Sequence, residues 1–220
     1  MTVKMFQSSE QTSNVIAMDR FRTDKRAHAL RQIEAYWTVL RSDGDLPYRS
    51  QIDPRGLENV LEHTFILERI APGIARFRIA GSHLVRLSGM EVRGMPMTCL
   101  FAAGARTTFS CALETCFDSP AIMMLDIEAE TGIGRPNLEG EIVLLPLKSD
   151  LGETNRVLGG MITRGPIGRT ARRFNITHVT DRLVYGTAKE ASAPAVQSFA
   201  EDAAPFDPCP SHLRLIKTDS

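Results

Sequence analysis

The sequence predicts an α+β domain in which helices cover one face of a five-stranded antiparallel β-sheet. Two observations carry this prediction. Five segments have the length and the apolar pattern of strands, and short turn-like stretches join neighbouring segments. An amphipathic helix precedes these segments, and shorter helical segments separate the second strand from the third. This order of elements is typical of an antiparallel sheet with segregated helices.

The five strands are expected at residues 64–70, 74–80, 121–130, 138–147 and 156–163. The first two form a hairpin, and in the second strand apolar residues such as Phe77 alternate with Arg76 and Arg78. That alternation predicts a sheet with one buried face. Gly159 and Gly160 lie in the middle of the last strand, where they indicate a bend or the close approach of another group.

Two helices are expected before the first strand. Residues 28–41 carry an apolar stripe at helical spacing, which we expect to contact a protein partner or a second copy of the chain. The stripe consists of Leu30, Ile33, Trp37 and Leu40. A shorter helix begins at Asp53-Pro54, because Asp caps free amides and proline suits the first helical position. We expect Arg49 to pair with Asp53 or with a carbonyl.

The stretch from 77 to 101 organises the rest of the predicted domain. The second strand, 74–80, leads into Gly81 and a short helix. Glycine turns at Gly89 and Gly94 follow, and then a helical stretch over 98–117 that is expected to break near Gly104. A strand followed by short helices forms a concave wall, which is how a small domain makes an internal pocket.

Charge and hydropathy exclude two classes of partner. The chain has 26 Lys and Arg against 26 Asp and Glu, a net charge of zero and a pI near 7.0. Proteins that bind nucleic acid usually show a basic excess, so no nucleic-acid partner is expected. No apolar run is long enough to span a membrane, and residues 1–14 lack the apolar core of a signal peptide. A cytoplasmic location is therefore expected.

The length of 220 residues predicts one domain with extensions. We expect a flexible leader over 1–24, the domain over 25–165, and an extension with a disordered tail over 166–220. Within that extension, residues 173–184 alternate weakly and are interpreted as a possible additional strand docked on the sheet.

Several of these segments together resemble the PAS-like subfamily abundant in alphaproteobacteria. The resemblance rests on the helix with Trp37, the segment RSQIDP at 49–54, the segment RFRIAGS at 76–82, and Gly89 and Gly94 in that spacing. It covers residues 28–165. Gln51 and Ser82 stand where the subfamily often has Asp and Thr. Its structural motif residues in this chain are Arg49, Asp53, Pro54, Gly81 and Gly94.

The resemblance implies a five-stranded antiparallel PAS sheet, in agreement with the strand pattern. It also implies a sensory or interaction module without chemistry of its own, often dimeric. The leading hypothesis is therefore a non-enzymatic PAS-like module in bacterial signalling that binds a small molecule, a protein partner or both.

An internal ligand pocket is the clearest functional expectation from the residues, because ligand sites are mostly apolar with a few polar groups. The alternative is a core filled by the same side chains, which would make the protein a scaffold. The side chains expected to converge on the pocket are Phe77, His83, Leu84, Leu87, Phe101, Met124, Leu145 and Met161.

Cofactor and metal patterns are weak, so the cofactor is left unknown. The segment MTCLF at 97–101 keeps a Cys but lacks the Asn, Arg and Gln of a photoactive flavin site. Haem needs an axial ligand facing an apolar cavity, for which His83 is the candidate. The four cysteines contain no C-x-x-C pair and the histidines no H-E-x-x-H motif, so no metal is expected.

Catalytic motifs are also missing from the sequence. It contains no G-x-S-x-G elbow and no phosphate-binding glycine loop. Asp126 and Glu128 share one side of a strand, which favours a solvated edge over a paired-carboxylate site. The rival function is a small α+β hydrolase or isomerase that uses a polar pocket residue, His83 being the candidate.

Overall fold

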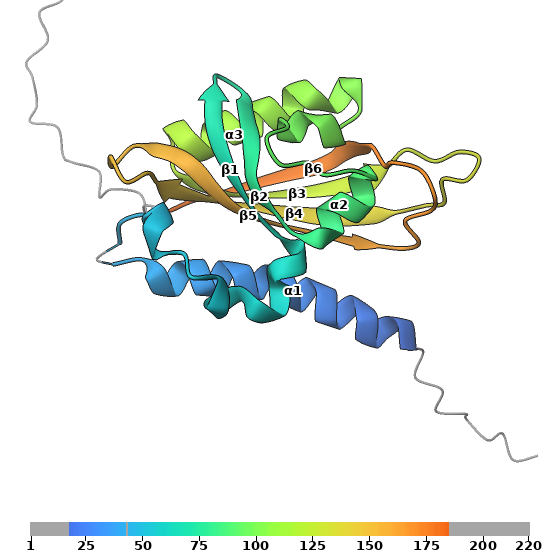
Figure 1. Cartoon of the computed structure of the whole chain (residues 1–220), viewed down its shortest axis with the longest axis horizontal. Helices are drawn as coiled ribbons and strands as arrows, with labels where there is room; N and C mark the ends of the chain where they lie inside the picture. The colour runs from blue at the N-terminus through green and yellow to red at the C-terminus, as the bar shows by residue number, and fades with distance from the viewer. Residues whose placement is uncertain (1–17, 43, 185–220) are drawn as a thin grey trace, which may run out of the picture. The chain divides into compact units, whose positions relative to one another are not determined.

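The computed structural model describes residues 18–42 and 44–184, and the elements that the sequence predicts are all present (Figure 1). Most of the predicted leader and the predicted tail lie outside the described residues. The helices are α1 (Met18–Leu40), α2 (Ser82–Ser88) and α3 (Arg106–Asp118), with 3₁₀ helices η1 (Arg49–Gln51), η2 (Pro54–His63), η3 (Met97–Leu100) and η4 (Ala103–Ala105). The strands are β1 (Thr64–Ala71), β2 (Ile74–Ala80), β3 (Ala121–Ala129), β4 (Glu139–Lys148), β5 (Thr154–Arg164) and β6 (Phe174–Leu183).

The sheet has six strands in the order β2-β1-β5-β4-β3-β6, and every neighbouring pair is antiparallel. The α+β prediction is confirmed, and β6 adds a strand to the five predicted. β6 pairs with β3 along its length, from Phe174 opposite Ala129 to Leu183 opposite Ala121. Phe174 is fully buried, whereas most other β6 side chains are partly or fully exposed. This exposure on an edge strand explains the weak alternation in its sequence.

One face of the sheet packs against α2, α3, η3 and η4, as the sequence predicts. This larger core takes every second residue of β3, including Met123, Leu125 and Ile127. Phe109 and Leu113 come from α3, and Phe101 stacks on Phe109 with ring centroids 4.5 Å apart.

The other face of the sheet is covered by α1 and η2 rather than left open (Figure 1). Leu30, Ile33 and Trp37 are buried against β4 and β5 of the same chain, and Trp37 Nε1 donates a hydrogen bond to Pro146 O at 2.9 Å. Leu40 is half-buried against the same cluster. The expectation that this stripe forms an intermolecular contact is therefore wrong, because the sheet of the same chain already covers it.

The mid-strand glycines of β5 are explained by side chains of the chain itself. A Cβ at Gly159 would lie 2.2 Å from the ring of Phe65, and one at Gly160 would lie 2.6 Å from Ile33 and 2.8 Å from Leu30. Gly159 thus admits an aromatic ring on one face, and Gly160 admits α1 on the other. The close approach that these glycines indicated comes from packing and not from a ligand.

Tyr36 ties η2 to α1. Its hydroxyl accepts a hydrogen bond from Asp53 N at 2.8 Å and donates one to Asp53 O at 3.1 Å. A Cβ at Gly56 would lie 2.2 Å from the Tyr36 ring. Asp53 also caps η2, accepting a hydrogen bond from Arg55 N, with Pro54 in the first position as the sequence predicts. The start of η2 is therefore hydrogen-bonded to α1, the helix that crosses the sheet.

No described helix has the length and apolar character needed to span a membrane.

Candidate functional site

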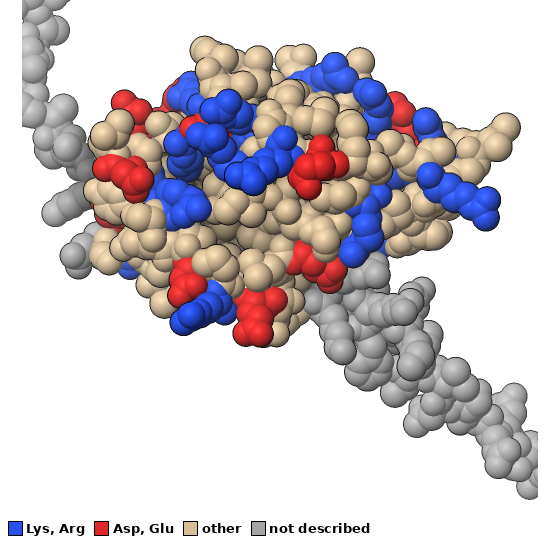
Figure 2. Space-filling model, in the orientation of Figure 1, with Lys and Arg blue, Asp and Glu red and all other residues tan. Residues whose placement is uncertain are grey.

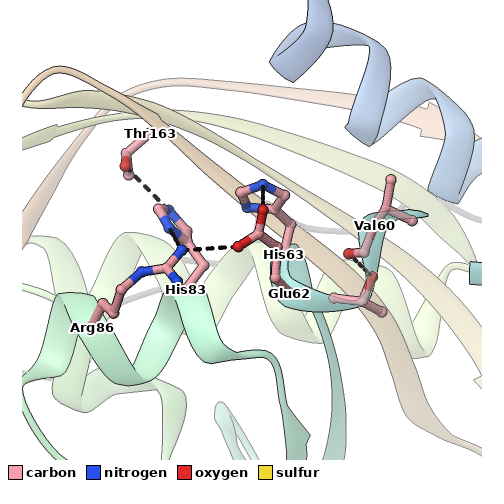
Figure 3. A network of polar contacts seen from close by, with 7 residues as sticks. Val60, Glu62, His63, His83, Arg86 and Thr163 are labelled. Carbon is pink, nitrogen blue, oxygen red and sulfur yellow. Dashed lines mark hydrogen bonds and ion pairs between the residues drawn. The ribbon is translucent and has the colours of Figure 1, made fainter. Parts of the chain in front are cut away.

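His83, the polar residue expected in the pocket, is buried in a network that joins three elements (Figure 3). Its Nε2 lies 3.1 Å from Thr163 Oγ1 of β5, and its Nδ1 lies 3.4 Å from Arg86 Nη2. The ring of His63, at the end of η2, packs edge-on against it with centroids 4.7 Å apart. Both nitrogens of His83 thus face protein groups, and His83 lines none of the pockets described below.

Glu62 completes this network at the surface. It pairs with Arg86 of α2 at 3.0 Å and lies 3.3 Å from His63. The hydrogen bond from Arg86 holds the pKa of Glu62 below its ordinary value; burial opposes this shift, and the charge on His63 adds to it. The hydroxyl of Thr163 in this network is buried together with His83, and neither residue lines any of the pockets described below. Its geometry fixes the end of η2 to α2 and to the sheet, and it gives no support to an acid–base role for His83.

The structure does not bring the eight expected pocket residues together. Five of them lie in the core beside α2 and α3, where each is fully buried: Phe77, Leu84, Leu87, Phe101 and Met161. Leu145 lies in the core on the opposite face, and Met124 is largely exposed on that face. Successive residues of a strand point to opposite faces, so these two cannot share a cavity with the other five.

The remaining reactive groups do not form a site. Burial raises the pKa of the Cys116 thiol, and burial also raises that of Cys99. Cys209 lies outside the described residues. Within the described ranges, no group of three or more His, Cys, Asp or Glu is arranged to hold a metal. Asp126 and Glu128 are both exposed in a shallow acidic depression.

An apolar pocket of about 240 Å³ lies on the other face of the sheet, between η1, η2 and strands β1, β2 and β5. We call it the η2 pocket. Three motif residues, Arg49, Pro54 and Gly81, line it, and Leu61 and Ile79 contribute partly exposed apolar side chains. Its other lining residues are Ile52, Leu57, Thr64, Ile66, Ala80 and Leu158. None of the eight expected pocket residues lines the η2 pocket, and five of them lie on the opposite face of the sheet.

Gly81 allows the close approach of two elements that border the η2 pocket, η2 and β2. A Cβ at Gly81 would lie 2.3 Å from Glu62 O and 2.4 Å from Leu61 O. Only glycine therefore lets the end of η2 approach the end of β2 so closely. Gly94, by contrast, lies outside the pocket in a turn with φ of +83°, a conformation that favours glycine.

A second, polar depression of about 400 Å³ adjoins the η2 pocket, and we call it the polar compartment. Arg49 and Ile66 line both depressions. The polar compartment is also lined by Arg78, Ser149, Asp150, Leu151, Asn155 and Arg156. Figure 2 shows basic side chains gathered over the β1–β2 hairpin, with acidic ones among and around them. The expected partner of Arg49 is not found: within the described residues its guanidinium has no ion pair or hydrogen bond, and Asp53 is used as the cap of η2.

Comparison with known protein families decides the identity of the domain. The model of the PAS domain family matches residues 25–162, which is more than half of the chain. The chain belongs to the PAS domain family. PAS domains are sensory and interaction modules, and the chain is assigned to that class. The family match ends within β5, so β6 lies beyond it.

The other comparisons add little to the family assignment. One solved structure with a similar fold is described as "Structure of an RNA-binding Light-Oxygen-Voltage Receptor", with a TM-score of 0.37 and 17% sequence identity. The similarity covers 56% of this chain and 37% of that one, so this PAS domain spans well under half of the receptor's length. None of the curated proteins compared with the chain is a significant match.

Three residues of the η2 pocket of this PAS domain, Arg49, Pro54 and Gly81, are also in the motif on which the sequence resemblance rests. Arg49, Pro54 and Gly81 were recognised only as structural motif residues. The signal that could have found the pocket is the motif itself, because an arginine, a helix start and a close-packed glycine from separate elements meet at one place.

Proposed function

We propose that this PAS domain is a non-enzymatic sensory module that binds a small molecule in the η2 pocket. The observation that carries the proposal is the η2 pocket itself, a mostly apolar concavity with a single charged side chain at its edge, which is the usual composition of a small-molecule site. The same motif residues support membership of the PAS-like subfamily of alphaproteobacteria, which we include in the proposal.

The position of η2 supports a route from ligand to output. η2 borders the pocket, is hydrogen-bonded to α1 through Tyr36 and Asp53, and is paired with α2 through Glu62 and Arg86. A ligand that displaces η2 therefore changes contacts with both helices. We propose that α1 passes this change to a protein partner or to a second copy of the chain.

Native mass spectrometry of freshly purified protein tests the proposal. We expect an added mass that disappears on denaturation. Ile79→Trp should lose the added mass, because Ile79 lines the η2 pocket and its partial exposure leaves room for a larger ring. Ile70→Trp is the matched control, since Ile70 is an exposed isoleucine of the same hairpin that does not line the pocket.

Two results would contradict the proposal. One is an added mass that Ile79→Trp retains in full, which would place the ligand elsewhere. The other is a bare wild-type mass together with no thermal stabilisation by any member of a library of small metabolites.

A further inference from the structure

We infer that the ligand of the η2 pocket is an amphipathic monoanion, with an apolar tail inside the pocket and a carboxylate held between Arg49 and the polar compartment. This inference rests on the proposed function and adds the chemical class of the ligand. It follows from three features of the two adjoining depressions: a cation between them that has no partner among residues 18–42 and 44–184, a surplus of positive charge beside them, and buried polar atoms that have no partner in the same part of the chain.

Arg49 occupies the boundary between the apolar and polar spaces. It lines both the η2 pocket and the polar compartment, and it is half-buried. No carboxylate in the described part of the chain pairs with it. A guanidinium at the edge of an apolar pocket can bind a carboxylate through two parallel hydrogen bonds. The apolar tail of the ligand would then lie on one side of the Arg49 side chain and its carboxylate on the other.

The neighbouring charges favour an anion. Glu68 is nearly buried and pairs with three arginines, Arg76 at 2.8 Å, Arg78 at 2.7 Å and Arg156 at 2.7 Å. One carboxylate cannot neutralise three guanidinium groups, so positive charge remains beside the polar compartment, to which Arg49 adds. The chain as a whole has no net charge, so the surplus is local to this part of the surface.

Asp150 limits the charge of the ligand. Its carboxylate is exposed and also lines the polar compartment. A group with two negative charges would meet this carboxylate as well as the arginines, and like charges repel. Because Glu68 and Asp150 already supply two negative charges beside the arginines, a carboxylate with one charge adds less repulsion there than a phosphate monoester does.

Two side chains of the polar compartment carry polar atoms that lack partners within the described residues. Ser149 is only 7% exposed, yet its Oγ makes no hydrogen bond, and neither does Asn155 Oδ1. A buried polar atom without a partner costs roughly 1–3 kcal/mol, so a ligand or a water that hydrogen-bonds to these atoms would remove that cost. The Ser149 hydroxyl can donate to a ligand carboxylate, while Asn155 Oδ1 can accept from a bridging water.

The size of the apolar space sets the length of the tail. At about 30 Å³ for a group of water or methylene size, a pocket of about 240 Å³ holds about eight such groups. Sodium octanoate is therefore a suitable probe, and 1-octanol is its uncharged counterpart.

The test is isothermal titration calorimetry of the full chain, refolded from urea to remove any copurified ligand. We expect octanoate to bind the wild type more tightly than 1-octanol. Arg49→Gln should weaken octanoate binding at least about tenfold, the effect of losing one charge-assisted hydrogen bond, with octanol binding unchanged. Arg55→Gln removes an exposed arginine at the start of η2 that lines neither space, and this variant should bind octanoate like the wild type.

A second pair of variants keeps the test independent of Arg49. Leu61→Glu places a negative charge at the edge of the η2 pocket and should weaken octanoate binding, whereas Leu61→Gln should leave most of it. Circular dichroism and the unfolding midpoint verify that each variant is folded.

The outcomes separate this inference from the proposed function. Equal binding of octanoate and octanol to all variants overturns the anionic class but leaves a ligand in the η2 pocket. Octanoate binding that ignores both Arg49→Gln and Leu61→Glu overturns the assigned site. Absence of octanoate binding overturns the inference, and the proposed function falls with it only if native mass spectrometry and the metabolite library also show no ligand.

Discussion

The ring of Phe65 on β1 lies directly over Gly159, its partner on β5, so closely that a Cβ at Gly159 would come within 2.2 Å of the ring. Phe65 also contacts Phe77 edge-on, with ring centroids 5.7 Å apart. The space that a glycine leaves in the middle of the sheet is therefore filled by an aromatic side chain. The ring of Phe65 therefore accounts for the glycine at this position, and the candidate site is the η2 pocket on the opposite face.

Gly159→Ala is expected to lower the free energy of unfolding by about 1–3 kcal/mol, because the added methyl group overpacks the core against Phe65. Urea denaturation measures the change. Gly104→Ala is the matched control, since nothing lies within 4 Å of a Cβ there, and it should stay within about 0.5 kcal/mol of the wild type. If Phe65 is the cause, Phe65→Ala should cost less in the Gly159→Ala background than in the wild type. Additive costs would contradict the explanation.

Trp37→Phe is expected to destabilise the chain by about 1–3 kcal/mol, since it leaves the buried Pro146 carbonyl without its donor. Circular dichroism during urea denaturation measures the free energy of unfolding, and it does not depend on fluorescence from Trp37, the single tryptophan of the sequence. Val39→Ala, on the exposed side of α1, should have almost no effect. The oligomeric state by light scattering should not change in either variant. Loss of a dimer in Trp37→Phe at unchanged stability would restore the interface that the structure rules out.

Glu68 should make the stability depend on pH in the acid range. Burial opposes its ionisation, but the hydrogen bond from Arg76 and the charges of Arg156 and Arg78 outweigh burial and hold its pKa below the ordinary 4.5. A lowered folded-state pKa stabilises the protein above the unfolded-state pKa, and this contribution is lost as the pH falls through the folded-state pKa.

The comparison of the wild type with Glu68→Gln isolates this contribution. The wild type should be more stable by a constant amount between pH 6 and 8, and the difference should shrink as the pH falls below about 4.5. Urea denaturation at a series of pH values measures both proteins. A difference that stays constant down to pH 3 would mean that Glu68 titrates alike in the folded and unfolded states.

Arg172 is expected to be a main structural residue of the link between β5 and β6. It is almost fully buried, and its guanidinium donates to Ile167 O, Glu130 O and Pro136 O at 2.9, 3.1 and 2.7 Å. Arg172→Met should lower the free energy of unfolding by about 2 kcal/mol, because three partly buried carbonyls lose their charged donor. Arg169→Met, at an exposed position nearby, should be neutral. Equal effects of the two variants would contradict this role.

Local patterns of the sequence predicted most of the fold. The alternation of β2 and β3, the stripe of α1 and the Asp53-Pro54 start of η2 each depend on neighbouring residues, and the structure confirms them. β6 was only a possible strand in the sequence, because an edge strand with one buried aromatic carries little alternation. The partner of the α1 stripe could not be predicted, since a helix that packs on its own sheet and one that packs on another chain have the same pattern.

The site was harder to predict because it depends on which face each residue takes. Met123 and Leu125 alternate with Met124 along β3, and this alternation already places Met124 on the opposite face. In β4 both faces are apolar, so the sequence alone does not show toward which face Leu145 points. The sequence does not show that Arg49 has no partner among the described residues, because this depends on Asp53 acting as the cap of η2. Residues from five separate elements, η1, η2, β1, β2 and β5, form the η2 pocket, and only the fold brings them together.

Methyl-labelled NMR during a titration with octanoate tests the central claim, that the ligand site lies on the α1 face and not in the core beside α2. We expect chemical-shift changes at the methyl groups of Leu57, Ile79 and Leu158, and we expect Arg49→Gln to need at least about tenfold more octanoate to produce them. Changes confined to Leu84 and Met161, with the η2 pocket unperturbed, would contradict it.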